Sequence, residues 1–153
     1  MKEGFRIEEA KPKDYKEILE LIGKEFSYFS PSMEELKQRL ETKLIVVFTA
    51  SQGEKLAGFI ELEIIDVNEA RVNGLTVKEE FRGKEAAKTL LSHAINYLKE
   101  QGIERVFLLV KQSNEAAKTL YKQFGFGFIG LYHKQLEGEI VEKMELSLIE
   151  EME

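Results

Sequence analysis

Apolar residues recur at helical spacing in four stretches of the chain, and polar or small residues bound each stretch. The first stretch, residues 13–26, places these apolar side chains on one helical face: Tyr15, Ile18, Leu19, Ile22 and Phe26. The segment 27–32 interrupts the pattern. Ser32 and Glu35 then have the spacing of a capping box, which predicts that a second helix begins just after Ser32.

Short apolar runs, typical of β-strands, occupy much of the remaining chain. We expect strands at residues 5–9, 44–50, 55–65, 70–77, 105–110, 126–134 and 139–148, and two further helices at 83–102 and 113–124. The tight turns between residues 44 and 77 indicate antiparallel neighbours. No Pro/Gly/Ser-rich linker divides the chain. The order of elements therefore predicts an α/β (α+β) fold, a mixed sheet covered by helices, in a single domain of residues 1–153.

Composition and charge exclude several classes of protein. The 153 residues include 22 Lys and Arg against 28 Asp and Glu, a net charge of −6, so a nucleic-acid partner is not expected. The absence of cysteine excludes disulfides, a cysteine nucleophile and cysteine-ligated zinc. The longest apolar runs are about five residues, whereas a membrane span needs about 20, and the first residues do not resemble a signal peptide. We expect no membrane partner and a cytoplasmic location.

Few residues have the chemistry of a metal or hydrolase site. Asp14 and Asp66 are the only aspartates, and His93 and His133 are the only histidines. No H-E-x-x-H, EF-hand or G-x-S-x-G motif occurs in the chain. We therefore expect no metal and no serine-hydrolase chemistry, and we interpret His93, in the middle of a helix, as a packing residue.

A candidate anion site follows the strand expected at 70–77. The segment Arg82-Gly83-Lys84-Glu85-Ala86-Ala87 leads into a helix, and the first backbone N–H groups of a helix have no partner within it. Together with the positive end of the helix dipole and the side chains of Arg82 and Lys84, they would suit a phosphate group. Many ordinary helices begin with Gly and Lys, so this segment alone leaves a purely structural role open.

The next strand–helix unit carries a more specific pattern. Asn114, Ala117, Leu120-Tyr121 and Gly125-Phe126 have the spacing N-x-x-A-x-x-L-Y-x-x-x-G-F. With Leu75-Thr76-Val77 and the loop that begins at Arg82, the chain resembles the GNAT superfamily of N-acetyltransferases. In the loop pattern (Q/R)-x-x-G-x-(G/A), Arg82 and Ala87 match, but Glu85 stands at the central glycine position. The resemblance extends from about residue 5 to residue 148.

This resemblance implies both a fold and a reaction. The fold would be a mixed, mostly antiparallel sheet of about seven strands, splayed centrally between residues 70–77 and 105–110 and covered by about four helices. The reaction would transfer an acetyl group from acetyl-CoA to a primary amine. The residues implied to bind the cofactor are Leu75, Thr76, Val77, Arg82, Gly83, Lys84, Glu85, Ala86, Ala87 and Asn114.

The resemblance also implies catalytic and substrate-binding residues. Tyr121 matches the general acid that protonates the leaving thiolate, a role within reach of a phenol. Glu61 and Glu63 lie on one face of their strand, and Glu63 is our candidate base, although exposed edge carboxylates remain the alternative. The residues implied to wall the acceptor pocket are Tyr28, Phe29, Tyr132 and His133.

Three functional hypotheses follow. The first is an N-acetyltransferase whose partners are acetyl-CoA and an amine. The second is a GNAT-fold module that binds acyl-CoA with weak or no turnover, which Glu85 favours and Tyr121 opposes, and the third is a scaffold that binds no CoA. For Glu85→Gly we expect modestly tighter acetyl-CoA binding and lower thermal stability, because Glu gains from the helix dipole. The identity of the amine and the oligomeric state, a homodimer included, stay open.

Overall fold

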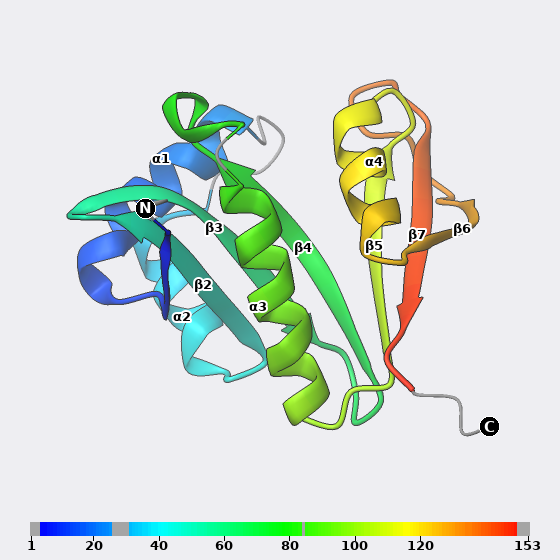
Figure 1. Ribbon diagram of the computed structural model, residues 1–153, viewed down its shortest axis with the longest axis horizontal. Coiled ribbons are helices and arrows are strands. Elements are labelled where there is room, and N and C mark those ends of the chain that lie inside the picture. Colours follow the sequence, from blue (N-terminus) through cyan, green and yellow to red (C-terminus); the bar gives the residue numbers. More distant parts are fainter. Residues whose placement is uncertain (1–3, 26–30, 84, 150–153) are drawn as a thin grey trace.

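A computed structural model describes residues 4–25, 31–83 and 85–149 of the chain (Figure 1). The strands are β1 (Arg6–Glu9), β2 (Ile45–Gln52), β3 (Lys55–Ile64), β4 (Glu69–Val77), β5 (Arg105–Lys111), β6 (Gly127–Leu131) and β7 (Val141–Ser147). The helices are α1 (Tyr15–Glu25), α2 (Met33–Glu41), α3 (Ala86–Glu100) and α4 (Glu115–Gln123), with short 3-10 turns η1 (Pro12–Asp14) and η2 (Glu79–Phe81).

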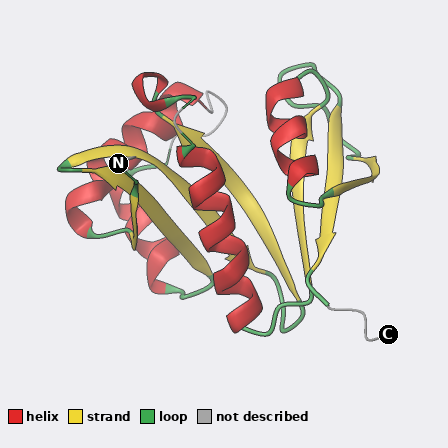
Figure 2. Cartoon of the chain, in the orientation of Figure 1, coloured by secondary structure: helices red, strands yellow, loops and turns green. Residues whose placement is uncertain are grey.

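The seven strands form one sheet in the order β1-β2-β3-β4-β5-β7-β6. Each neighbouring pair is antiparallel except β4 and β5, which are parallel. The chain reaches β5 from β4 through α3, the kind of crossover that a parallel pair requires (Figure 2). The sequence prediction of a mixed, mostly antiparallel sheet of seven strands with four α-helices is confirmed for the described residues.

Helices cover both faces of the sheet, and each face has its own hydrophobic core. Apolar side chains of α3 and α4, such as Leu90 and Tyr121, pack with one face in a core that includes Ile60 and Val106. On the other face, Ile18 of α1 and Leu36 of α2 pack against β2 and β3. Figure 1 shows α3 lying across β3 and β4, while α4 lies along β5.

Most predicted elements end within three residues of the observed ones. Ser32 caps α2 through the predicted capping box, since its side chain accepts the N–H of Glu35 and the Glu35 side chain accepts the N–H of Ser32. His93 packs its ring against Phe48 at a centroid distance of 4.6 Å, as a packing residue should. The last hairpin differs from the prediction: β6 ends at Leu131, and the connection to β7 runs over residues 132–140.

The parallel pair β4–β5 separates along its length. Backbone pairing joins only Glu69–Val72 of β4 to Arg105–Leu108 of β5. From Asn73 onward β4 continues along β3 alone, while β5 continues along β7. The two strands therefore diverge from a shared base, as Figure 1 shows, and β4 beyond Val72 has an edge without a strand partner among the described residues.

Candidate functional site

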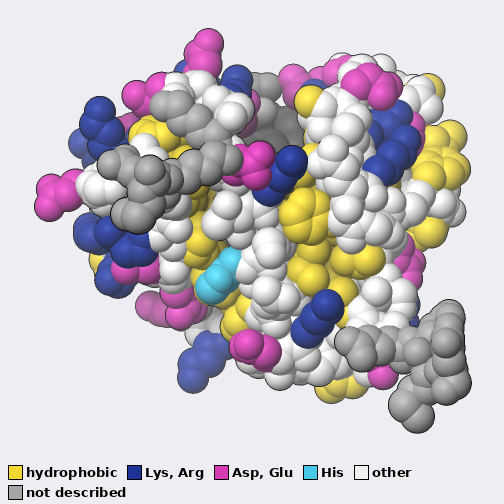
Figure 3. Space-filling model, in the orientation of Figure 1, with side chains coloured by type: hydrophobic (Ala, Val, Ile, Leu, Met, Phe, Trp, Pro, Cys, Tyr) yellow, Lys and Arg dark blue, Asp and Glu magenta, His cyan; other side chains and the backbone are white. Residues whose placement is uncertain are grey.

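A cavity of about 510 Å³ lies where β4 and β5 diverge. Its walls come from the end of α1, from α2, from β3, β4, β5 and α4, and from the loop after β6. This volume falls in the usual range of small-molecule sites. Figure 3 shows hydrophobic side chains at the surface between α3 and α4. On this side of the sheet α3 lies across β4 and α4 lies along β5, the two strands that border the cavity.

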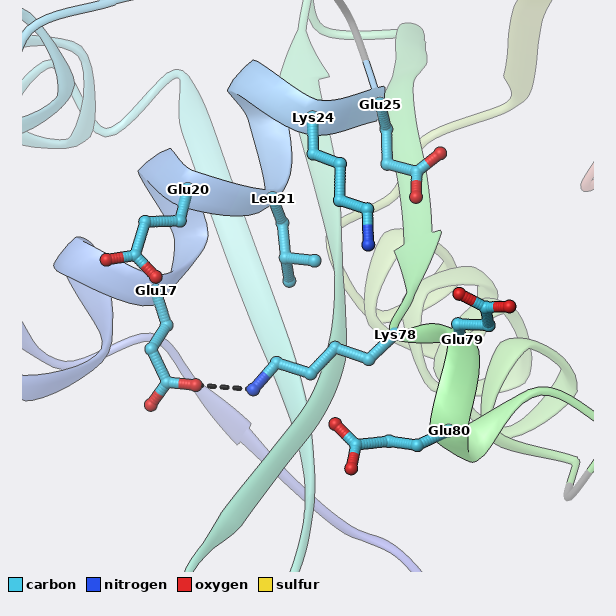
Figure 4. A pocket seen from close by; sticks show the side chains of 8 residues that line it. All are labelled: Glu17, Glu20, Leu21, Lys24, Glu25, Lys78, Glu79 and Glu80. Carbon is cyan, nitrogen blue, oxygen red and sulfur yellow. Dashed lines mark hydrogen bonds and ion pairs between the residues drawn. The ribbon is translucent and has the colours of Figure 1, made fainter.

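A second hollow of about 520 Å³ lies between α1 and η2 (Figure 4). Glutamates dominate its wall, and Lys78 crosses it to pair with Glu17. Of the residues that the structure describes, Glu25 alone lines both this hollow and the cavity between β4 and β5. Because none of the sequence-predicted site residues that the structure describes lines this hollow, we place the candidate site in the cavity between β4 and β5.

A carboxylate network forms one wall of this cavity. Arg39 Nη2 donates to Glu61 Oε2 at 2.6 Å. The Asn73 side-chain amide donates to Glu61 Oε2 at 2.7 Å and to Glu63 Oε1 at 3.0 Å. Glu61 is 6% exposed, and a buried charge needs compensating partners. The Arg39 cation and the Asn73 amide provide them. Glu63 receives the same amide but forms no ion pair with a described residue.

A β-bulge brings this network together. The register between β3 and β4 shifts at Glu61 and Leu62, whose partners are Gly74 and Val72, so Asn73 is the extra residue on β4. A β-bulge points a side chain in a different direction from the one it would have in a regularly paired strand. Both carboxylates lie on the inner strand β3, between β2 and β4, so the alternative of exposed edge carboxylates is wrong.

Tyr121 reaches the same cavity from α4. It is 8% exposed, and its ring packs against Phe126 with a centroid distance of 5.7 Å. Burial in this apolar setting raises the pKa of Tyr121 to about 12. The phenol therefore keeps its proton at neutral pH and is a hydrogen-bond donor there.

Three predicted cofactor residues lie on β4 beyond Val72, where the described residues provide no partner strand on the β5 side. Leu75 lines the cavity, whereas Thr76 is buried and Val77 is half-buried. Arg82 follows η2 and folds back over the end of β4, where its Nε donates to the Val77 carbonyl at 3.2 Å. The Arg82 guanidinium also pairs with Glu25 at 2.9 Å, in an exposed position.

The loop before α3 uses left-handed backbone at two positions. Gly83 has φ +79°, and Glu85, the residue before α3, has φ +72° and ψ +6°. A glycine at the position of Glu85 would adopt this conformation without strain, so the family's glycine has a backbone reason. Ala86 and Ala87 form the first turn of α3. Lys84 lies outside the described residues.

The remaining predicted residues divide into three groups. Asn114 lines the cavity and caps α4, because its side-chain oxygen accepts the N–H of Ala117 at 3.1 Å. Tyr132 also lines the cavity, whereas His133, in ring contact with Tyr132 at 4.4 Å, does not. Tyr28 and Phe29 lie outside the described residues.

Several residues at the cavity were not predicted from the sequence: Arg39, Arg71, Asn73 and Lys111. Arg71 and Asn73 alternate with buried Ala70 and Val72, a pattern that ordinarily marks the solvent face of a strand. For Asn73, the signal that could have found it is the glycine that follows it inside a strand, Gly74, because a strand glycine often marks a bulge.

The described residues contain no group of three or more His, Cys, Asp or Glu side chains arranged to hold a metal ion. Among the helices that the structure describes, none has the length and apolar character needed to cross a membrane.

Comparison with known proteins identifies the family. The profile of the acetyltransferase (GNAT) family matches residues 15–126. Over 79 residues, 52% of this chain and 53% of the relative, the chain is 30% identical to the [ribosomal protein bS18]-alanine N-acetyltransferase of Escherichia coli K12. Over 89 residues, 58% of this chain and 55% of the relative, it is 35% identical to a spermidine N(1)-acetyltransferase of Thermoplasma acidophilum. The chain thus spans about half the length of the curated relatives that it matches.

Solved structures share the fold across nearly the whole chain. The crystal structure of the ribosomal-protein alanine N-acetyltransferase of Escherichia coli superposes with a TM-score of 0.82, at 21% identity, over 97% of each chain. The spermidine N-acetyltransferase of Vibrio cholerae, solved with CoA and spermine, gives a TM-score of 0.80 at 21% identity over 94% of this chain and 95% of that one. The sequence prediction of the fold family is confirmed.

Proposed function

Because the chain belongs to the acetyltransferase (GNAT) family, we propose that it is an N-acetyltransferase that transfers an acetyl group from acetyl-CoA to a primary amine. The observation that carries this proposal is the cavity between β4 and β5, which gathers a free strand edge, the Tyr121 phenol and the Glu63 carboxylate. The named relatives support it, since they are N-acetyltransferases.

Acetyl-CoA is the co-substrate of this family, and the geometry of β4 fits its pantetheine arm. Beyond Val72, β4 has no partner strand on the β5 side among the described residues, so the backbone groups of Leu75 and the N–H of Val77 can pair with an extended ligand. The Val77 carbonyl accepts from Arg82 Nε instead. The amides of Gly83 to Ala87, with Arg82 and Lys84, would then receive the pyrophosphate. Asn114 uses its side-chain oxygen as a helix cap, which leaves its Nδ2 donors for the cofactor arm.

Arg82 has to exchange partners when the pyrophosphate binds. Its guanidinium pairs with Glu25 at 2.9 Å, and the two side chains are 54% and 31% exposed. An exposed pair of this kind contributes about 0–1 kcal/mol. Exchange of the Glu25 carboxylate for a phosphate therefore costs little.

Glu63 is our candidate base. The Asn73 amide fixes Glu63 Oε1 at 3.0 Å, while Glu61 is already neutralised by Arg39. Glu63 therefore takes the proton that the attacking ammonium loses, either directly or through water. The amine nitrogen forms a bond to the acetyl carbon, and the carbon–sulfur bond to CoA breaks.

Tyr121 is our candidate donor to the leaving sulfur. With a pKa of about 12 it is fully protonated at neutral pH. A thiol such as cysteine has a pKa near 8.5, so complete transfer from the phenol is uphill by about 3.5 units, or about 5 kcal/mol. Tyr121 therefore acts by hydrogen-bonding to the developing thiolate. The nitrogen loses a first proton to Glu63 before attack and a second proton to water when the tetrahedral adduct collapses, and CoA leaves as a thiolate that takes its proton from water.

The test is acetyl transfer to a panel of primary amines, with release of the CoA thiol and the mass of the acetylated amine both recorded. We expect one class of amine to give both signals with equal stoichiometry. Tyr121→Phe should bind acetyl-CoA as tightly as the wild type and lower kcat by roughly 10²–10³-fold, the effect of removing one hydrogen-bond donor to a developing anion. Binding of acetyl-CoA without transfer to any amine would instead support the module without turnover, and the proposal would be wrong.

A further inference from the structure

Among the described residues, six charged side chains line the cavity between β4 and β5, and most of them already have partners. They are Glu25, Arg39, Glu61, Glu63, Arg71 and Lys111. Arg39 pairs with Glu61 and Glu25 with Arg82, while Lys111 pairs with Glu137 at 2.8 Å. Of the six, only Glu63 and Arg71 form no ion pair with a described residue.

Arg71 lines the cavity, and part of its hydrogen-bonding capacity is unmet. Its Nε is buried and has no hydrogen-bond partner among the described residues. A buried donor without a partner costs free energy unless a ligand or water satisfies it. The side chain is held near the Phe107 ring, whose centroid lies 6.0 Å from the Arg71 Cζ.

Arg71 has a second cation near its aromatic neighbour and no ion-pair partner among the described residues. Lys143 Nζ lies 4.6 Å from the same Phe107 ring, so two cations flank one aromatic side chain. No described carboxylate lies within 4.0 Å of Arg71 or Lys143. The planar guanidinium presents donors in a fork that matches the two oxygens of a carboxylate.

The CoA phosphates are too far away to be this anion. Arg71 precedes Val77 by six residues of β4, which at about 3.3 Å per residue corresponds to about 20 Å. The pyrophosphate loop begins only after Val77, at Arg82. The anion that Arg71 receives therefore belongs to the acceptor.

Arg71 and Glu63 face the acceptor together. They are directly paired across β3 and β4 in the register, so they occupy one face of neighbouring strands. Directly opposed residues have Cβ atoms about 4.5–5.5 Å apart. A cation site and an anion site that lie this close match a molecule whose amine and carboxylate are separated by only a few bonds.

We propose that the acceptor is a free amino acid, whose amine is held at Glu63 and whose carboxylate is held by Arg71. This inference rests on the proposed N-acetyltransferase function and narrows its substrate class. A polyamine would place a second cation against Arg71, and a peptide would present an amide where the free carboxylate belongs.

The experiment compares α-amino acids with their carboxamides, with spermidine, and with a short peptide that begins with alanine. The readout is kcat/KM for acetyl transfer in the wild type, Arg71→Gln, Arg71→Lys and the control Arg105→Gln. Arg105 is a half-buried β5 residue outside the cavity that contacts Glu104 and Glu145, so its substitution removes the same charge elsewhere. Thermal unfolding of each variant establishes that it is folded.

We expect the wild type to prefer at least one free amino acid to its carboxamide, to spermidine and to the peptide. Arg71→Gln should lower the ratio of acid to carboxamide by roughly 10- to 150-fold, the effect of one charged hydrogen bond. Arg71→Lys should lower it less, and Arg105→Gln should leave it unchanged. The comparison of ratios cancels the different basicities of the two amines.

Each other outcome overturns the inference in a distinct way. A wild type that prefers spermidine or the peptide overturns it, and so does an acid-to-carboxamide ratio that Arg71→Gln leaves unchanged, while both outcomes leave the N-acetyltransferase function intact. The wild-type preference decides the matter even if the Arg71 variants do not fold. Acetyl-CoA binding without transfer to any amine overturns the proposed function as well.

Discussion

At the scale of single residues, Tyr121 links burial to pH. Its folded pKa is about 12, because burial disfavours the phenolate, whereas an exposed tyrosine has a pKa near 10. Below pH 10 the phenol is protonated in both states, and its contribution to stability is complete. As the pH rises from 10 towards 12, the unfolded state ionises first, so stability falls by up to about 2.7 kcal/mol for two pKa units.

We therefore predict that wild type loses more stability than Tyr121→Phe between pH 9 and pH 12. Denaturant unfolding at several pH values measures this difference, and the other tyrosines, present in both proteins, cancel. Parallel stability curves for the two proteins would contradict the raised pKa. In that case Tyr121 would be accessible enough to ionise in the folded state.

A second prediction concerns Glu85, whose backbone conformation changes the thermal stability that we expect for Glu85→Gly. From the sequence alone, Glu85→Gly is expected to lower thermal stability. At φ +72° a non-glycine residue costs about 1–2 kcal/mol, whereas the favourable position at the helix N-terminus contributes about 0.3–1 kcal/mol. We now expect Glu85→Gly to unfold at the wild-type temperature or slightly above it.

The same substitution should tighten acetyl-CoA binding by up to about fourfold for each phosphate charge within about 5 Å, because a solvated negative charge is removed. Glu85→Gln is the matched control, since it removes the charge and keeps the backbone strain. Calorimetric titration should give similar affinities for the two variants, and thermal unfolding should separate them. A Gly variant that unfolds clearly below the wild type would contradict the backbone argument.

At the scale of elements, the approach of β3 to β4 depends on Gly58. A Cβ atom at this position would lie 2.3 Å from the Thr76 carbonyl oxygen and 2.9 Å from the Val77 Cα. Both are backbone atoms of the strand that we propose to hold the cofactor. The clash therefore cannot be relieved by a side-chain rotation and has to displace β4.

We predict that Gly58→Ala destabilises the fold by about 1–3 kcal/mol, typical of an overpacked core, and weakens acetyl-CoA binding. Gly23→Ala is the control. Gly23 lies in α1 with nothing within 4 Å of its added Cβ, so alanine there should stabilise the helix by about 0.5–1 kcal/mol. Equal stability of the two variants in denaturant unfolding would contradict this prediction, because it would show that β4 can move away from Gly58 without a cost in free energy.

Elements were more predictable than the site because periodicity reports which side chains are buried, and burial defines helices and strands. The same periodicity reports Arg71 and Asn73 only as polar positions of β4. Whether such a position faces water or a cavity depends on the separation of β4 from β5 and on the bulge at Asn73, both of which arise from pairing between distant segments. Tyr121 and Asn114 were identified because their spacing within one helix matches a family pattern.

At the scale of the whole molecule, the sheet consists of two parts with a narrow connection. Strands β1 to β4 form one part, β5 to β7 form the other, and four residue pairs between β4 and β5 join them. A ligand in the cavity contacts both parts, since residues of β3, β4, β5 and α4 all line it. Binding should therefore stabilise the native arrangement of the two parts against unfolding.

We predict that acetyl-CoA at 100 times its Kd stabilises the protein by about 2.7 kcal/mol, which for a chain of this size raises the Tm by roughly 5–11 °C.

Arg82→Ala should weaken binding by about threefold to tenfold, and a tenfold loss removes about 1.4 kcal/mol of this stabilisation. The loss should shrink at high salt, because salt screens an exposed guanidinium. Arg105→Ala, which removes the same charge from the base of β5, should keep the wild-type shift. Melting curves at several acetyl-CoA and salt concentrations measure all three effects. A Tm that millimolar acetyl-CoA does not move would place the cofactor outside this cavity and contradict the site.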